Sequence, residues 1–222
     1  MIVIINTLML LFFMTIMIII VKDKITLHED IIFLLESPPK KDINSLRTIT
    51  ENKIANEDDM VIDLLYEKSY DDIQQTLSMR DCENKNIFSY TIILTALFSV
   101  FYIFIKIPFN QIYKEIFFQL LTCLAFCFVC LFFSTTAYFK ALSFQYELPR
   151  DIEPLIGGYD IKTIKANTIA VNAVGAQMNQ DANRNKIRAC KIAKKYIKYC
   201  LLFYFIFGIA IFLFRFFQTF NQ

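Results

Sequence analysis

Cys123, Cys127 and Cys130 are the residues of this chain whose type and spacing come closest to a reactive site. Three thiolates in the pattern C-x3-C-x2-C can hold an iron–sulfur cluster when they lie on a loop, as in radical-SAM enzymes. Here they lie inside the apolar run LLTCLAFCFVCLFF, at the i, i+4, i+7 spacing of one helix face. Buried cysteine behaves as a small hydrophobic residue. We therefore interpret the three cysteines as packing residues and predict no cluster and no metal.

The remaining side chains do not form a catalytic set. His28, in the sequence LHED, is the only histidine, and its neighbourhood lacks the further ligands that a metal site needs. The chain has no G-x-S-x-G, no phosphate-binding loop and no H-E-x-x-H. The sequence therefore predicts a non-enzymatic protein with no catalytic residues and no cofactor.

The elements that would position any site are four apolar blocks separated by charged segments. Each block has close to the ~20 residues that a helix needs to cross a ~30 Å hydrocarbon layer. The blocks are Ile2–Val21, Ile87–Ile107, Ile116–Phe139 and Tyr199–Phe217. They predict an all-α integral membrane protein with four transmembrane helices. Three of these would form a core, the N-terminal one would be an anchor, and the charged segments would form a small helical cytoplasmic domain.

The boundaries of the predicted segments follow from these blocks. Ile2–Val21 has no basic residue before it and no small-x-small cleavage site after it, so we expect a signal-anchor that is not cleaved. The predicted segments are an N-terminal transmembrane anchor (1–21), an acidic cytoplasmic helical segment (22–86), a transmembrane hairpin (87–139), a basic cytoplasmic loop and helix (140–196), a final transmembrane helix (197–217) and a short tail (218–222).

Positive charge is concentrated in the two segments that would share one side of the membrane. Of the 23 Lys and Arg residues, 20 lie between the first and second blocks or between the third and fourth. Cytoplasmic loops carry such an excess, so both segments are predicted to be cytoplasmic and both termini outside. Basic residues next to the last span are expected to contact lipid headgroups. They include Arg188, Lys191, Lys194 and Lys195.

The two predicted cytoplasmic segments have opposite net charge. Residues 22–86 carry six more acidic than basic residues, whereas the segment from residue 140 to the last block carries six more basic than acidic ones. We expect the two segments to pack together. A nucleic-acid site is the competing interpretation of the basic segment. Its position beside a span favours anionic lipid instead, and we predict no direct nucleic-acid site.

Periodicity and helix-breaking residues place the helices within these segments. A short helix is predicted around Glu29–Glu36, and a longer one from Asn56 to Asn84 that continues into the second span. Prolines and a glycine pair between residues 146 and 160 predict a loop. Asp160 is suited to cap the next helix, which no proline interrupts before the last span.

A face of this last helix carries amides where a membrane-proximal helix would ordinarily carry charge. Asn172, Asn179, Asn183 and Lys186 fall on one narrow stripe. An uncharged polar face can form hydrogen bonds to a neighbouring helix without the desolvation cost of ions. One interpretation is a contact within the chain that fixes the cytoplasmic domain. The other is that the amides set the register between subunits of a homo-oligomer, as a buried Asn does in coiled coils.

The second span carries a polar stripe of its own. Its members are Thr91, Thr95, Ser99, Tyr102 and Lys106. Small hydroxylated residues let transmembrane helices approach closely, which is the structural interpretation. The functional interpretation is a partly polar lining that water reaches when subunits assemble.

Two short stretches carry a resemblance to a known group of proteins. They are YFKALSFQYELPRDI (Tyr138–Ile152) and NQDANRNKIRACKIAKKY (Asn179–Tyr196). With the helix before the hairpin, they resemble small bacterial membrane proteins found with anti-phage systems, including SLATT-type effectors and the membrane effectors of retrons. The shared features are a helix entering a two-span hairpin, a Tyr-x-Leu-Pro loop, and a helix with spaced Asn that enters a last span. The additional N-terminal block departs from the three-span pattern.

The resemblance implies an effector of abortive infection in the bacterial inner membrane. Such a protein would be held inactive by a cytosolic protein or ribonucleoprotein partner, and would oligomerise to depolarise or permeabilise the membrane on infection. The alternative is a membrane anchor or scaffold that recruits a cytosolic enzyme. The lipid bilayer and further copies of the chain are the other expected partners.

Overall fold

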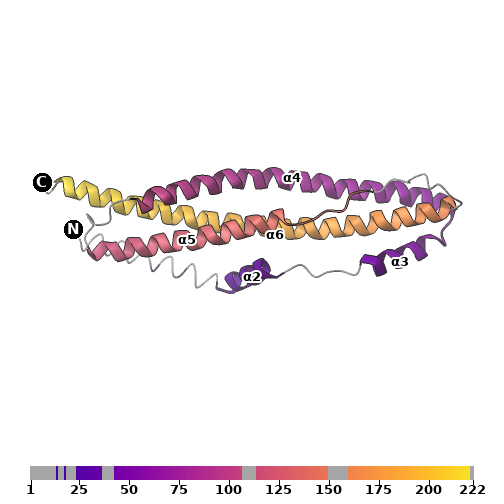
Figure 1. Ribbon diagram of the computed structural model, residues 1–222, viewed down its shortest axis with the longest axis horizontal. Helices are drawn as coiled ribbons and strands as arrows, with labels where there is room; N and C mark the ends of the chain where they lie inside the picture. Colours follow the sequence, from indigo (N-terminus) through magenta and orange to yellow (C-terminus); the bar gives the residue numbers. More distant parts are fainter. Residues whose placement is uncertain are drawn as a thin grey trace. The chain divides into compact units, whose positions relative to one another are not determined.

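The computed structural model describes residues 14, 18, 24–36, 43–106, 114–149 and 160–220. Within these ranges all regular structure is α-helical (Figure 1). The helices are α2 (Lys24–Leu35), α3 (Ile43–Ile54), α4 (Asp59–Ile105), α5 (Lys114–Leu142) and α6 (Ile161–Phe220). The prediction of an all-α chain is therefore confirmed for the described residues.

Among the described residues, three helices are long and apolar enough to cross a membrane. They are α4, the part of α5 from Leu120 to Leu142, and the part of α6 from Ile161 to Leu213. These correspond to the second, third and fourth predicted blocks. The first block, Ile2–Val21, lies outside the described residues except for Met14 and Ile18, both of which are helical.

The helix boundaries agree with the sequence in most places. α4 runs without a break from the charged segment into the second block, and α6 does the same into the last block. The Ile164 amide donates to the Asp160 carbonyl at 3.2 Å, so α6 begins where Asp160 was expected to cap it. α3 is the helix that the sequence did not predict, because its mixture of polar and apolar residues shows no clear periodic run.

The chain divides into two compact units, which we describe separately. The apolar unit comprises Met1–Glu36, Phe88–Lys140 and Ala189–Gln222, and the polar unit comprises Ser37–Ile87 and Ala141–Arg188. α4 and α6 each contribute one part to each unit. Each of these two unbroken helices therefore carries both charged and apolar sequence.

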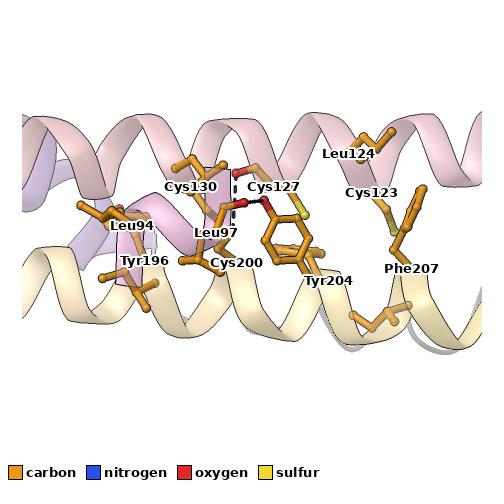
Figure 2. Close-up of a cluster of buried hydrophobic side chains, with 14 of the residues drawn as sticks. Leu94, Leu97, Cys123, Leu124, Cys127, Cys130, Tyr196, Cys200, Tyr204 and Phe207 are labelled. Atoms are coloured by element: carbon orange, nitrogen blue, oxygen red, sulfur yellow. Dashed lines mark hydrogen bonds between the residues drawn. The ribbon is translucent and has the colours of Figure 1, made fainter. Parts of the chain in front are cut away.

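Helices α4, α5 and α6 form the core of the apolar unit. Leucines, cysteines and aromatic residues interlock there, as Figure 2 shows for one cluster. The predicted helix face of Cys123, Cys127 and Cys130 is buried in this cluster, as is Cys200 on α6. Phe126 stacks on Phe203 with ring centroids 5.4 Å apart. The cysteines thus pack as the small apolar residues that the sequence indicated.

Polar contacts also join the helices within this core. The Tyr204 hydroxyl on α6 donates to the Leu97 carbonyl on α4 at 2.8 Å (Figure 2). The Ser134 hydroxyl on α5 donates to the Ala193 carbonyl at 3.2 Å. Such bonds contribute about 0.6 kcal/mol on average between transmembrane helices, and their value here is to fix which faces meet.

Helix α2 packs at the charged end of the apolar unit, where two lysines hold it. The Lys195 ammonium on α6 lies 3.1 Å from the Asp30 carboxylate, and both side chains are largely buried. Lys140, at the end of α5, donates to the carbonyls of Phe33 and Glu36. The last carbonyls of a helix have no partner within it and carry partial negative charge, so a lysine is a suitable cap.

The polar unit confirms the expected packing of acidic on basic segments. Asp59 on α4 lies 3.3 Å from Lys162 on α6, and Asp63 lies 2.5 Å from Lys165. A small core lies beside these pairs, formed by Ile54, Ile62, Ala166 and Ile169. Because contacts advance along both helices in the same direction, α4 and α6 run parallel in this unit. The ion pairs are largely exposed, so the buried apolar residues contribute more stability.

Candidate functional site

The predicted polar stripe of α4 lies mainly on the outside of the chain. Only Thr91 bonds to another helix, with its hydroxyl 2.6 Å from that of Tyr138. Thr95 and Ser99 are exposed, and each donates to a carbonyl four residues earlier in α4, at 2.9 Å in both cases. A hydroxyl bonded in this way is satisfied without a second helix. The stripe therefore presents small polar groups outward along an apolar span.

The stripe ends in a cation–aromatic pair at the C-terminal end of α4. The Lys106 ammonium lies 4.5 Å from the centroid of the Tyr102 ring, and both side chains are exposed. A long side chain of this kind can place its charge in the headgroup layer while its methylene groups stay beside the apolar helix.

The amide face of α6 is buried, in contrast to the stripe. Asn172, Asn179, Asn183 and Lys186 are exposed by 4% or less. All four lie in the polar unit, and the last three contact α4 or the extended segment that follows α5 (residues 143–149). Buried polar groups need hydrogen-bond partners. Those of Asn179, Asn183 and Lys186 include groups of α4 and of the extended segment.

Asn179 connects the extended segment to α4. Its side-chain oxygen accepts the Glu147 backbone N–H at 2.8 Å, and its NH₂ group donates to the Glu147 carbonyl at 2.9 Å. The same NH₂ group lies 3.2 Å from the Thr76 hydroxyl. One amide side chain thus satisfies both backbone groups of a residue that belongs to no helix.

Asn183 repeats this arrangement one turn later. Its side-chain oxygen accepts the Tyr146 hydroxyl at 2.9 Å, and its NH₂ group donates to the Thr76 carbonyl at 2.9 Å. Asn179 and Asn183 therefore hold two consecutive residues, Tyr146 and Glu147, against α6 and also bond to Thr76 on α4. Because a helix places i and i+4 on one face, the spacing of the two amides matches two neighbouring anchor points.

Lys186 completes the row. Its ammonium donates to the Asn84 side-chain oxygen at 2.5 Å and lies 5.4 Å from the centre of the Tyr146 ring. The Arg80 guanidinium lies 5.6 Å from the same ring centre. Two cations from two helices therefore face one tyrosine. We call these eight residues the amide cluster: Thr76, Arg80, Asn84, Tyr146, Glu147, Asn179, Asn183 and Lys186.

Within the described ranges, no group of three or more His, Cys, Asp or Glu side chains is arranged to hold a metal ion. No protein-family model, curated protein or solved structure matches the chain. The chemistry of the amide cluster therefore has to be argued from its own groups. Amides, hydroxyls and two cations can position a polypeptide segment and attract an anion.

Sequence reasoning found the α6 side of the amide cluster and missed the α4 side. Thr76, Arg80 and Asn84 lie at i, i+4 and i+8, so they form a stripe of polar residues along α4. That stripe was not recognised because α4 also carries many charged residues that face solvent. The signal that could have found it is the similar helical spacing of two polar stripes on helices predicted to be neighbours.

The basic residues assigned to lipid headgroups differ in exposure. Arg188, Lys191 and Lys194 are exposed. Lys195 is the exception, because its side chain is 25% exposed and pairs with Asp30. Lys195 therefore secures α2 within the apolar unit, which is a role that the sequence did not indicate.

Proposed function

We propose that this chain is a non-enzymatic effector of bacterial anti-phage defence that acts on the inner membrane. In this proposal a cytosolic protein or ribonucleoprotein holds it inactive through the polar unit, which lies in the cytoplasm. Its release lets copies of the chain assemble and depolarise or permeabilise the membrane. The resemblance of the Tyr138–Ile152 and Asn179–Tyr196 stretches to such effectors supports this context.

The observation that carries the proposal is the outward polar stripe on α4. Thr95, Ser99 and Tyr102 are exposed on a helix that is apolar enough to span a membrane. Small hydroxylated residues favour close helix approach in membranes, and a second copy would meet them on this face. Contacts between copies along the stripe would bring several hydroxyls and Lys106 around one axis, where water and ions can pass.

Membrane potential in living cells tests this proposal. Cells that express the chain without its partner should lose the signal of a potential-sensitive dye. The double variant Thr95→Val and Ser99→Ala changes the side-chain sizes little and removes both outward hydroxyls. It should reduce depolarisation several-fold at equal membrane abundance, since the proposed lining loses its polar groups.

A matched control lies on α5. Thr135 and Thr136 also donate to carbonyls four residues earlier in their own helix, at 2.7 and 2.9 Å. These two hydroxyls lie on α5 and are not part of the α4 stripe. The double variant Thr135→Val and Thr136→Val should therefore depolarise cells as the natural chain does. If the dye signal never falls, while the host system still protects against phage, the effector proposal is wrong.

An anchor or scaffold is the second candidate, favoured by the exposed cations before the last span. Lys191 and Lys194 are exposed on α6 and available to an acidic partner. This candidate predicts that Lys191→Glu with Lys194→Glu abolishes protection, whereas the α4 hydroxyl variant retains it. Lys195 is unsuitable for the test, because its reversal would also break the ion pair with Asp30.

A further inference from the structure

The amide cluster borders an open cavity at the surface of the polar unit. The cavity has a volume of about 400 Å³. It is lined by Arg80, Asn84, Leu142, Phe144, Tyr146, Leu148 and Lys186. Small-molecule sites typically occupy about 300 to 1,000 Å³ and combine apolar walls with a few convergent polar groups. Both conditions are met here.

The polar side of the cavity carries two cations. Arg80 comes from α4 and Lys186 from α6, and both face the Tyr146 ring at 5.6 and 5.4 Å. Lys186 is only 3% exposed, and none of the seven lining residues is acidic. The Arg80 Nε pairs with Asp81 at 3.0 Å, but the Asp81 side chain is 61% exposed. Two cations brought together in a partly buried place attract an anion strongly.

The other wall is apolar and held in place. Phe144, Tyr146 and Leu148 alternate along the extended segment, so their side chains lie on one side of it. Asn183 holds the Tyr146 hydroxyl, and Asn179 holds the Glu147 backbone. The amides of α6 therefore fix the position of the segment that forms this wall. The buried amide face thus positions the cavity wall in addition to joining α6 to α4.

We propose that this cavity binds a phosphate monoester whose remaining part is apolar or aromatic. A phosphate monoester carries about −1.5 to −2 charges at neutral pH, which two cations balance. Arginine offers a planar fork of N–H groups and lysine a point charge, and both bind phosphate well. The apolar or aromatic part would lie against Leu142, Phe144 and Leu148. Binding does not depend on the proposed membrane disruption.

Two sources of this chemistry are available to a membrane protein. A soluble nucleoside monophosphate would place its base on the aromatic wall. Phosphatidic acid would place its chains along the apolar wall, and Asn84 is only three residues before the second apolar block. The two sources share the phosphate site and differ in whether the ligand arrives from water or from the bilayer.

Binding to the full chain in phosphatidylcholine nanodiscs tests the proposal. AMP is titrated in one arm, with adenosine as its control. Phosphatidic acid is added to the nanodiscs in the other arm, with diacylglycerol as its control. We expect saturable binding in at least one arm and none of the two phosphate-free controls. Arg80→Gln should weaken that binding about tenfold or more, as for the loss of a hydrogen bond to a charged group.

Arg184→Gln is the matched control for charge, because Arg184 is exposed on α6 and does not line the cavity. It should leave affinity nearly unchanged. Lys186→Gln, which keeps a donor toward Asn84, should weaken binding as Arg80→Gln does. Binding of AMP alone supports a soluble ligand, and binding of phosphatidic acid alone supports a lipid. Absence of binding in both arms overturns the proposal, as does equal weakening by Arg80→Gln and Arg184→Gln.

Discussion

Asn179 pairs with the backbone of Glu147 in the way that one strand pairs with the next. Its side chain accepts the Glu147 N–H at 2.8 Å and donates to the Glu147 carbonyl at 2.9 Å. A residue between helices would otherwise depend on water for both groups. The pair thus fixes the extended segment after α5 against α6, and with it the wall of the cavity.

Replacing Asn179 with Ala should destabilise the polar unit by about 2 to 4 kcal/mol. The variant removes the partners of two backbone groups and leaves them poorly solvated, which costs more than the bonds themselves. Thermal unfolding in detergent, followed by circular dichroism, measures the loss. Proteolysis should also cut the chain faster near Tyr146 and Glu147.

Gln180→Ala is the control for this prediction, because Gln180 is the neighbouring amide and is exposed on α6. It should unfold like the natural chain. Equal effects of Asn179→Ala and Gln180→Ala would mean that the contact with Glu147 contributes nothing to stability.

Gly175 allows the close approach of α4 and the extended segment to α6. A Cβ atom at this position would lie 3.0 Å from the Ile73 Cδ1 and 3.2 Å from the Glu147 Cβ. We expect Gly175→Leu to destabilise the polar unit by about 1 to 3 kcal/mol through overpacking. Gly175→Ala should cost less than Gly175→Leu, since the Ile73 Cδ1 is the far end of a flexible side chain and alanine favours helix.

Gly208 serves as the reference for the glycine variants. No atom lies within 4 Å of a Cβ added there. Gly208→Ala should therefore leave the melting temperature unchanged or slightly raised. Tolerance of Gly175→Leu at the level of Gly208→Ala would show that α4 and α6 do not need this close approach.

The ion pair between Asp30 and Lys195 should stabilise the docking of α2. Both side chains are less than a third exposed, so a double-mutant cycle with Asp30→Asn and Lys195→Met should give about 1 to 2 kcal/mol of coupling. Hydrogen exchange along α2 reports the docking directly. The exposed pair Asp59–Lys162 should give under about 0.5 kcal/mol in the same cycle. Equal coupling in both pairs would contradict the assignment of Lys195 to α2.

Much of the fold follows from patterns that are local in the sequence. Three of the four apolar blocks lie in helices that are long and apolar enough to cross a membrane, and the absence of proline between Asp160 and the last block indicates an unbroken α6. Opposite net charge predicts the contact of α4 with α6, which Asp63 and Lys165 make. These features depend on composition and periodicity, which a single sequence displays.

The partners within the amide cluster depend on register, which a single sequence does not display. The stripe of Asn179, Asn183 and Lys186 is visible, but its pairing with Thr76 and Asn84 requires the offset between two parallel helices. The extended segment adds a second unknown, because Tyr146 lies in a region whose prolines and glycines predict only a loop. The pairing of Lys195 with Asp30 could not be predicted for the same reason, since the two residues are distant in the sequence.

Cys82 gives a direct test of which side of the membrane the polar unit occupies. It is exposed on α4, whereas the other five cysteines are buried. A membrane-impermeant maleimide should therefore label Cys82 only after the inner membrane of spheroplasts is permeabilised. Lys106→Cys in a Cys82→Ala background supplies a position just after the C-terminal end of α4, where the exposed residue should react in intact spheroplasts. If Cys82 reacts before permeabilisation and Lys106→Cys only after it, the predicted orientation is inverted, and a cytosolic partner could not reach the polar unit.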